Sequence, residues 1–541
     1  MSEVTSDAAA RGKCGPIRES RRTHWRMLSL LGVHLFIIIH VIQWKMHGRT
    51  LSPLEPSESM QTLQTGMINA GFILFALATL ATMIFGRFFC GWACHLLAYQ
   101  DAAGWIMTKA GIKPRPFRSR LLVFVPYGAA FYMFVWPSLA RALSGGDSPR
   151  WAFHLTTASF WATFPGLWIS LLSIIVCGVL VIVFLGNKGF CTYACPYGAL
   201  FSPADRLAPG KILVSPACDG CGHCTAACTS NVRVHEEAKL YRRVTDPGCM
   251  KCLDCVDVCP RQALSFGWTR PELGRKKAPR APRRYDFGWW EEIAMGLIFL
   301  GTMYAVRGLY EAVPFLLSLG IAAITAYLAL VWFRNWRAPF STIQAWTLRR
   351  AGRFTPAGLG MQIAVGVLFL FLGHSGVIQY RIHEAEYRIA EANQTTDANA
   401  FERSARAALG HYQFCLEYGL VDVAAWRQGI GSVQALLGLD AEAEQNLTRA
   451  LELDDSLARA HISLADLLGR REQFGPAIDH LRQAARLDPA LAFAPYMDVV
   501  LQYGDAPRLN TALELTSELG GRLDPALSVR ARDALRARGA R

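Results

Sequence analysis

Long apolar runs separated by charged stretches dominate the chain up to about Tyr380, and their lengths predict membrane-spanning helices. Each of seven runs is long enough to cross about 30 Å of hydrocarbon. The runs cover residues 27–44, 65–85, 121–143, 167–185, 289–309, 313–333 and 357–380. The fifth run is the least apolar because Glu291 and Glu292 open it, and the Trp289–Trp290 pair beside them is typical of an interfacial anchor. We therefore expect a mostly α-helical, polytopic membrane bundle with about seven spans.

The pattern changes in the tail, where residues 424–457 align without gaps on residues 458–491, a repeat of 34 residues. Apolar or small residues recur at equivalent positions, as in Ile430/Leu464, Ala443/Ala477, Leu447/Leu481 and Ala450/Ala484. The length and the small residues resemble tetratricopeptide repeats (TPR), in which paired helices stack into an α-solenoid. Residues 401–423 and 492–519 are expected to supply degenerate capping helices. The resemblance implies a protein partner for this domain, and a generic bundle of helical hairpins is the alternative.

Charge also differs between the apolar part of the chain and the tail. Only 18% of the 541 residues are charged, which argues against a single soluble enzyme. The net charge of +14 comes from the apolar part, because the tail from Arg381 carries 18 Arg against 23 acidic residues. Alternate connections between the runs hold 33 basic residues and the others only five. This positive-inside pattern places the N-terminus in the cytoplasm and the tail on the opposite side of the membrane, and it argues against nucleic-acid binding.

Eight cysteines in the longest cytoplasmic connection carry the strongest chemical signal. They form two consecutive runs, Cys218-x-x-Cys221-x-x-Cys224-x-x-x-Cys228 and Cys249-x-x-Cys252-x-x-Cys255-x-x-x-Cys259-Pro260. This is the spacing of a two-cluster bacterial ferredoxin, in which the fourth Cys of each run binds the other [4Fe–4S] cluster. We expect one cluster on Cys218, Cys221, Cys224 and Cys259 and the other on Cys249, Cys252, Cys255 and Cys228. Zinc is the alternative, but it would need only four of these thiols.

Two further cysteine pairs close the second and fourth apolar runs. Cys90 and Cys94 form one Cys-x-x-x-Cys pair, and Cys191 and Cys195 form the other. The charge pattern places both pairs at the cytoplasmic surface. Four thiols there are expected to form an additional redox or metal site: a further metal centre, a copper(I) site or a redox dithiol. Buried structural thiols and a stretched c-type haem motif are the remaining alternatives.

These motifs together resemble the NapH/NosR/CcoG-type membrane polyferredoxins of bacteria. The resemblance covers about residues 25–271, and the run Cys249–Cys259 is most similar to the NapH branch. It implies electron transfer between a membrane or cytoplasmic donor and a partner redox protein, and quinol is among the candidate donors. In one branch of the family it implies copper reduction during oxidase assembly. The chain departs from the pattern at His95, where the family usually has proline, and in carrying the tail domain.

Motifs and resemblance together predict an iron–sulfur electron carrier of the bacterial inner membrane, with the ferredoxin insert in the cytoplasm and the tail in the periplasm. A stand-alone enzyme is not expected, and no residue is singled out as catalytic. A copper-handling assembly factor and a docking scaffold with structural clusters are the competing hypotheses. Five histidines lie near the first and seventh runs: His34, His40, His47, His374 and His383. Polar rings in a membrane can bind a quinone or ligate haem, but we expect these histidines to form helix–helix hydrogen bonds instead. The expected domains are a cytoplasmic segment (1–26), spans one to four (27–187), an α+β ferredoxin insert (188–270), a basic linker (271–288), spans five to seven (289–380) and the TPR-like tail (381–541).

Overall fold

The structure of the chain is a computed structural model that describes residues 17–535 except 113, 115–116, 146–148, 150, 158–159, 161–165, 272–284, 519–528 and 531–532. Cys14 and most of the predicted basic linker lie outside these residues. The chain divides into two compact units. One comprises Met1–Arg307 with Ala312–Leu370, and the other comprises Gly308–Glu311 with Phe371–Arg541.

Five helices in the described part of the chain are long and apolar enough to cross a membrane. They are α2 (Arg21–His47), the composite helices Leu122–Leu143 and Leu167–Leu185, α17 (Phe315–Arg337) and α18 (Pro356–Gln394). The other two predicted runs are also helical. However, α4 (Ala70–Phe85) has only 16 residues, or about 24 Å at about 1.5 Å per residue, and α16 (Trp289–Val306) has 18 residues that include both glutamates. The count of seven spans therefore remains a prediction.

The two glutamates that weaken the fifth run have structural roles at its start. Glu292 is fully buried and accepts hydrogen bonds from the amides of Arg120 (2.8 Å) and Leu121 (3.2 Å). These amides open the third apolar run, so the carboxylate satisfies N–H groups that have no partner within their own helix. Glu291 instead forms an ion pair with Arg334 of α17 at 2.6 Å. Both charges are therefore compensated where α16 begins.

The third and fourth runs are helices with irregular turns. The third consists of η2 (Leu122–Phe124), α7 (Val125–Ala130), the π-turn η3 (Phe131–Val135) and α8 (Trp136–Leu143), and the fourth consists of α9 (Leu167–Ser173), the π-turn η5 (Ile174–Leu180) and α10 (Val181–Leu185). Pro137 is the second residue of α8, two residues after the end of η3. Proline has no N–H for the i→i−4 bond and its ring displaces the preceding carbonyl, which accounts for the irregular turn before it.

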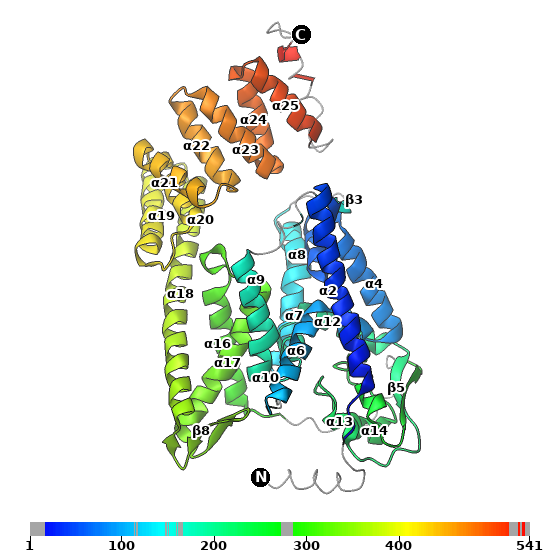
Figure 1. The fold of residues 1–541 in the computed structure, drawn as a ribbon. Coiled ribbons are helices and arrows are strands. Elements are labelled where there is room, and N and C mark those ends of the chain that lie inside the picture. The colour runs from blue at the N-terminus through cyan, green and yellow to red at the C-terminus, as the bar shows by residue number, and fades with distance from the viewer. Residues whose placement is uncertain are drawn as a thin grey trace. The chain divides into compact units, whose positions relative to one another are not determined.

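The ferredoxin insert is a small α+β unit at one end of the helices (Figure 1). Strand β5 (Gly210–Val214) pairs antiparallel with β6 (Leu264–Trp268), with Ile212 opposite Phe266. Between the strands lie the short helices α13 (His223–Ala226), α14 (Val234–Tyr241) and α15 (Asp254–Asp257). Helix α2 begins at this end of the helices (Figure 1). A second sheet lies at the same end and consists of β7 (Ser341–Ile343), β8 (Trp346–Arg350) and β9 (Arg353–Phe354).

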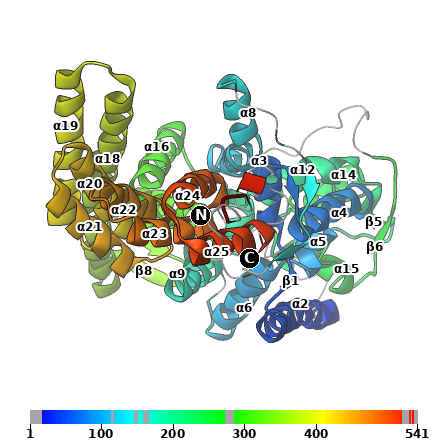
Figure 2. The same ribbon diagram turned by 90° about the horizontal axis from the view of Figure 1, so that it is seen from above.

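Further elements complete the first of the two compact units. They are β1 (Thr50–Leu51), η1 (Pro56–Glu58), α3 (Ser59–Thr65), β2 (Met67–Ile68), α5 (Phe88–Trp92), α6 (His95–Lys109), β3 (Ala152–Phe153), β4 (Thr156–Thr157), α11 (Gly189–Tyr193) and α12 (Pro196–Leu207). Strand β1 pairs antiparallel with β4, and β2 pairs parallel with β3. Seen from above, α12 and α4 lie side by side (Figure 2), and α4 ends in Gly86, which leads into α5.

The described part of the tail unit contains η6 (Leu309–Glu311), the C-terminal part of α18 and a series of further helices. They are α19 (Ala398–Tyr418), α20 (Ala424–Leu436), α21 (Asp440–Leu453), α22 (Ala458–Arg470), α23 (Phe474–Leu487), α24 (Pro489–Tyr503) and α25 (Ala506–Glu518). The 34-residue repeat corresponds to two helical hairpins, α20–α21 and α22–α23. Its equivalent residues are buried in both hairpins, as Ala443 and Ala477 show. Gly431 packs against Leu447 so closely that a Cβ would lie 2.6 Å from its Cγ. The helical repeat is thus present, whereas membership in the TPR class remains a prediction.

Candidate iron–sulfur centres

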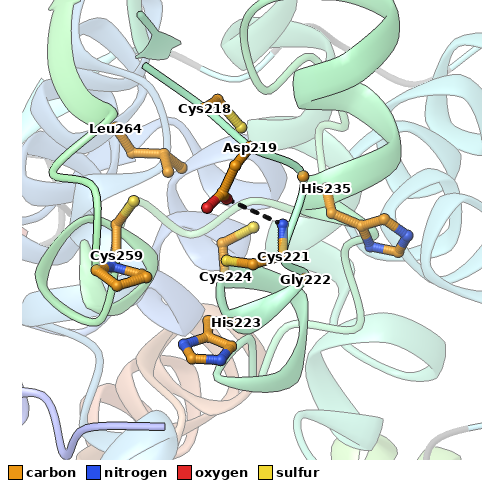
Figure 3. Close-up of a pocket in the computed structure, with 11 residues that line it drawn as sticks. Cys218, Asp219, Cys221, Gly222, His223, Cys224, His235, Cys259 and Leu264 are labelled. Atoms are coloured by element: carbon orange, nitrogen blue, oxygen red, sulfur yellow. Dashed lines mark hydrogen bonds between the residues drawn. The ribbon is translucent and has the colours of Figure 1, made fainter. Parts of the chain in front are cut away.

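The first predicted ligand group converges on one pocket (Figure 3). Its lining includes Cys218, Cys221, Cys224 and Cys259, with Leu264 and the buried His223 beside them. Cys221 lies in the loop that leads into α13, Cys224 is the second residue of that helix, and Cys259 comes from the end of the second cysteine run. The pocket is open on one side, where Gly220 and Asp219 are exposed.

The donor set of this pocket fits an iron–sulfur cluster. Burial, followed by repulsion from the thiolates of Cys221, Cys218 and Cys259, raises the pKa of Cys224 to about 12. Four thiolates this close oppose one another's ionisation, and a cationic iron core removes that penalty. Gly220 and Gly222 have φ of 75° and 81°, a conformation that glycine adopts without a steric penalty. Among the described residues, no three His, Cys, Asp or Glu side chains converge closely enough for a single metal ion.

The second predicted group is more deeply buried. Cys252 and Cys255 are both buried; Cys252 lies in the loop before α15, and Cys255 is the second residue of that helix. Burial, followed by repulsion from Cys249, Cys252 and Cys228, raises the pKa of Cys255 well above its usual range. The thiolate of Cys224, a first-group ligand, also contributes to this shift. The two groups of four thiols therefore lie close together.

The backbone of the second loop repeats that of the first with different residues. Lys251 and Leu253 occupy the positions of Gly220 and Gly222 in the cysteine run, and their φ values are 51° and 66°. A non-glycine residue in this left-handed region costs about 1–2 kcal/mol. Lys251 also forms a buried ion pair, with its Nζ 2.9 Å from the carboxylate of Asp205. Sequence reasoning missed Lys251, although its place at the glycine position of the other loop was a usable signal.

The two Cys-x-x-x-Cys pairs meet and form a third group of four thiols. Burial, followed by repulsion from Cys191 and Cys90, raises the pKa of Cys94 to about 12. Cys195 experiences the same effects, from burial and then from Cys191 and Cys94. The two pairs therefore lie near one another, and their role as an additional redox or metal site remains a prediction.

The two halves of the third group are built alike. In each, a long apolar helix ends at a glycine with positive φ, Gly86 (79°) or Gly186 (86°), and a five-residue helix carries the first cysteine. The second cysteine is the residue before the next helix, α6 or α12. His95 occupies the first position of α6, where Pro196 stands in α12, and its Nε2 lies 3.6 Å from Glu55. The departure from proline at His95 therefore leaves the local geometry intact.

The third and second groups adjoin through direct backbone contact. Gly91 lies between Cys90 and Cys94, and a Cβ on it would be only 2.3 Å from the carbonyl oxygen of Met250. Trp92 donates its indole N–H to the carbonyl of Lys251 at 3.1 Å. The loop that carries Cys249 and Cys252 is therefore seated on the helix that carries Cys90.

Buried ion pairs fix this arrangement, and the sequence did not indicate them. Arg26 of α2 contacts Asp254 at 2.7 Å and Asp101 of α6 at 3.0 Å. Asp101 also accepts from Lys188 at 2.9 Å. These side chains connect the first span to both cysteine-bearing regions.

The histidines near the membrane have ordinary partners. His34 and His47 contact carbonyls of their own helix, those of Leu30 and Gln43, at 2.8 and 3.0 Å. The expectation of helix–helix hydrogen bonds was therefore wrong for these two. His374 contacts the carbonyl of Tyr418 in α19 at 2.9 Å, as that expectation required.

Comparisons with known proteins agree with this reading of the cysteines. A family described as a 4Fe-4S binding domain matches residues 69–113 and 167–214, which contain the third group. A family described as a 4Fe-4S dicluster domain matches residues 217–264, which contain the other two.

Similar proteins point the same way. The ferredoxin-type protein NapH of Haemophilus influenzae is 24% identical over 286 residues, which are 48% of this chain and 93% of that protein. The putative electron transport protein YccM of Escherichia coli is 25% identical over 330 residues, covering 53% of this chain and 84% of the relative. The methylamine utilization ferredoxin-type protein MauN of Methylorubrum extorquens is 26% identical over 181 residues, covering 32% and 60%. The chain thus resembles ferredoxin-type membrane proteins with 4Fe-4S domains.

Proposed function

We propose that this chain, similar to NapH-type ferredoxin proteins, is an inner-membrane electron carrier that passes single electrons between a donor and a redox partner protein. The observation that carries the proposal is the series of three adjoining groups of four thiols. The first group opens to the surface and the second adjoins both others. When bound, iron–sulfur clusters supply reversible one-electron chemistry. The chain supplies burial, loop geometry and fixed spacing between the sites.

The ligand assignment follows from the grouping of the thiols. One cluster is held by Cys218, Cys221, Cys224 and Cys259, and another by Cys228, Cys249, Cys252 and Cys255. For the third group, a further [4Fe–4S] cluster on Cys90, Cys94, Cys191 and Cys195 is favoured over copper, because the family matched there is a 4Fe-4S binding domain.

The iron content tests this function. Anaerobically purified protein is expected to contain about twelve irons per chain, four for each cube. Replacing Cys90 and Cys94 by Ser should reduce the content to about eight, because two of the four ligands of one cube are lost. The same change at Cys249 and Cys252 should remove a different set of about four. Zinc in place of iron, or clusters that cannot be reduced and reoxidised, would contradict the electron-carrier function.

Sidedness is a separate part of the proposal. We place the ferredoxin insert in the cytoplasm and the helical tail in the periplasm, where the tail docks a protein partner. Trypsin added to spheroplasts is expected to digest the Arg-rich tail and to leave the insert intact, and inside-out vesicles should give the opposite result. Digestion of the insert in intact spheroplasts would contradict this orientation.

A further inference from the structure

The third thiol group has a buried cation beside it. The guanidinium of Arg87 is buried, with Nη2 3.8 Å from Sγ of Cys90. Nη1 donates to the carbonyl of Pro247 at 2.9 Å, in the segment that leads to Cys249. Arg87 thus lies against the third group and the segment that opens the second. Gly198 leaves room for it, since a Cβ there would lie 3.3 Å from Nη2.

The charge of Arg87 is not balanced by a carboxylate. In the described part of the chain its guanidinium makes no ion pair, although its backbone N–H donates to Asp205 at 3.2 Å. A buried cation without a counter-charge is strongly unfavourable in an apolar interior. When deprotonated, as cluster ligands are, Cys90, Cys191 and Cys195 attract this guanidinium, and Sγ of Cys90 lies 3.8 Å from it. Among the described residues, the thiol site therefore supplies the anionic group that the Arg87 side chain contacts directly.

A second polar side chain, on α6, contacts the third thiol group. Gln100 is buried and donates from Nε2 to Sγ of Cys191 at 3.3 Å. Its Oε1 has no hydrogen-bond partner among the described residues. An unsatisfied buried oxygen costs about 1–3 kcal/mol, so leucine would fill this position at lower cost if only packing mattered. The N–H···S hydrogen bond is the feature that glutamine adds.

We propose that Arg87 and Gln100 tune the reduction potential of the third centre, making it more positive. This inference rests on the proposed function, because it requires a cluster on Cys90, Cys94, Cys191 and Cys195. Reduction adds one electron and no proton, so the cluster with its thiolates becomes more negative. A fixed positive charge and an N–H donor in a buried site stabilise that added charge more than they stabilise the oxidised form. Hydrogen bonds to sulfur and nearby charge are established determinants of cluster potential.

The experiment is a redox titration of the full-length protein with dithionite and mediator dyes, followed by EPR. The signal of the third centre is identified as the one that disappears when Cys90 and Cys94 are both replaced by Ser. For Arg87→Gln we expect at least a tenfold decrease in the ratio of reduced to oxidised third centre at a fixed potential. This corresponds to a midpoint about 59 mV more negative for one electron. Gln100→Leu should shift the midpoint in the same direction by a smaller amount.

Two controls separate tuning from a structural role. Arg87→Lys keeps the charge and should restore most of the midpoint. Arg233→Gln removes an ion-paired, solvent-accessible cation directly before α14. This change should leave the midpoint potential of the third centre unchanged. If Arg87→Gln fails to fold, Gln100→Leu decides alone, because it removes the N–H donor without changing any charge and leaves a side chain of similar size.

The outcomes distinguish the inference from the function on which it rests. A third centre that is present at full iron content but has an unchanged midpoint in both variants would overturn the tuning role alone. An iron content that does not fall when Cys90 and Cys94 are replaced would overturn the third cluster and the tuning role together.

Discussion

Replacing Asp205 by Asn is expected to lower the free energy of unfolding by about 3–5 kcal/mol. The carboxylate is fully buried and lies 2.8 Å from Nζ of Lys211 and 2.9 Å from Nζ of Lys251. Asparagine leaves two buried ammonium groups without the carboxylate that pairs with both of them. Thermal unfolding of the detergent-solubilised protein, compared with wild type, measures the effect.

The matched control is an exposed ion pair in the tail. Glu402 and Arg406 lie 2.7 Å apart with side chains that are 53% and 65% exposed. Glu402→Gln should therefore cost no more than about 1 kcal/mol. Adding Lys251→Met to Asp205→Asn should recover part of the loss, since one unpaired cation is removed. Equal losses for Asp205→Asn and Glu402→Gln would contradict the role of the buried pair.

The effect of Asp205 should also depend on pH. Burial acts to raise the pKa of Asp205, but Lys251 and Lys211 outweigh it and hold that pKa below the usual value. A lowered pKa in the folded state stabilises the protein at every pH above the unfolded value of about 3.9. This contribution is lost as the pH falls through the folded pKa. The difference in stability between wild type and Asp205→Asn should thus be constant near neutral pH and shrink below about pH 4.

Gly91→Ala is expected to destabilise the junction between the ferredoxin insert and the cysteine-bearing helix by about 1–3 kcal/mol. The new Cβ would lie 2.3 Å from the carbonyl oxygen of Met250, so two backbones must separate. Thermal unfolding and protease cleavage of the insert measure the change, and slower electron exchange between the second and third centres should accompany it.

Gly301→Ala in α16 is the matched control for this substitution. Nothing lies within 4 Å of a Cβ at Gly301, and alanine favours a helix interior over glycine by about 1 kcal/mol. We therefore expect Gly301→Ala to be neutral or stabilising. Equal behaviour of the two variants would show that the close approach at Gly91 does not matter.

The sequence predicted the cysteine groups because their spacing is local. Three thiols in each ferredoxin run lie within a few residues, and the convergence of Cys218 with Cys259 follows from a known loop pattern. The ion pairs could not be predicted in this way. Arg26 meets Asp254, and Asp205 meets Lys251, across long stretches of chain with no periodic relation. Hydropathy likewise indicated where α4 and α16 lie. However, α4 ends just before Gly86, and α16 begins with Glu291 and Glu292, whose partners hydropathy does not reveal.

The contact between Arg26 and Asp254 also bears on the order of biogenesis. A ribosome completes the first helix long before it reaches Asp254, which lies 228 residues later. At about 5–20 residues per second this interval is about 10–45 s. During that time Arg26 lacks its aspartate in the insert. The loop that carries Cys252 can therefore reach its final place against α2 only after the first four apolar runs have been synthesised, so this end of the molecule is completed late relative to its first helix.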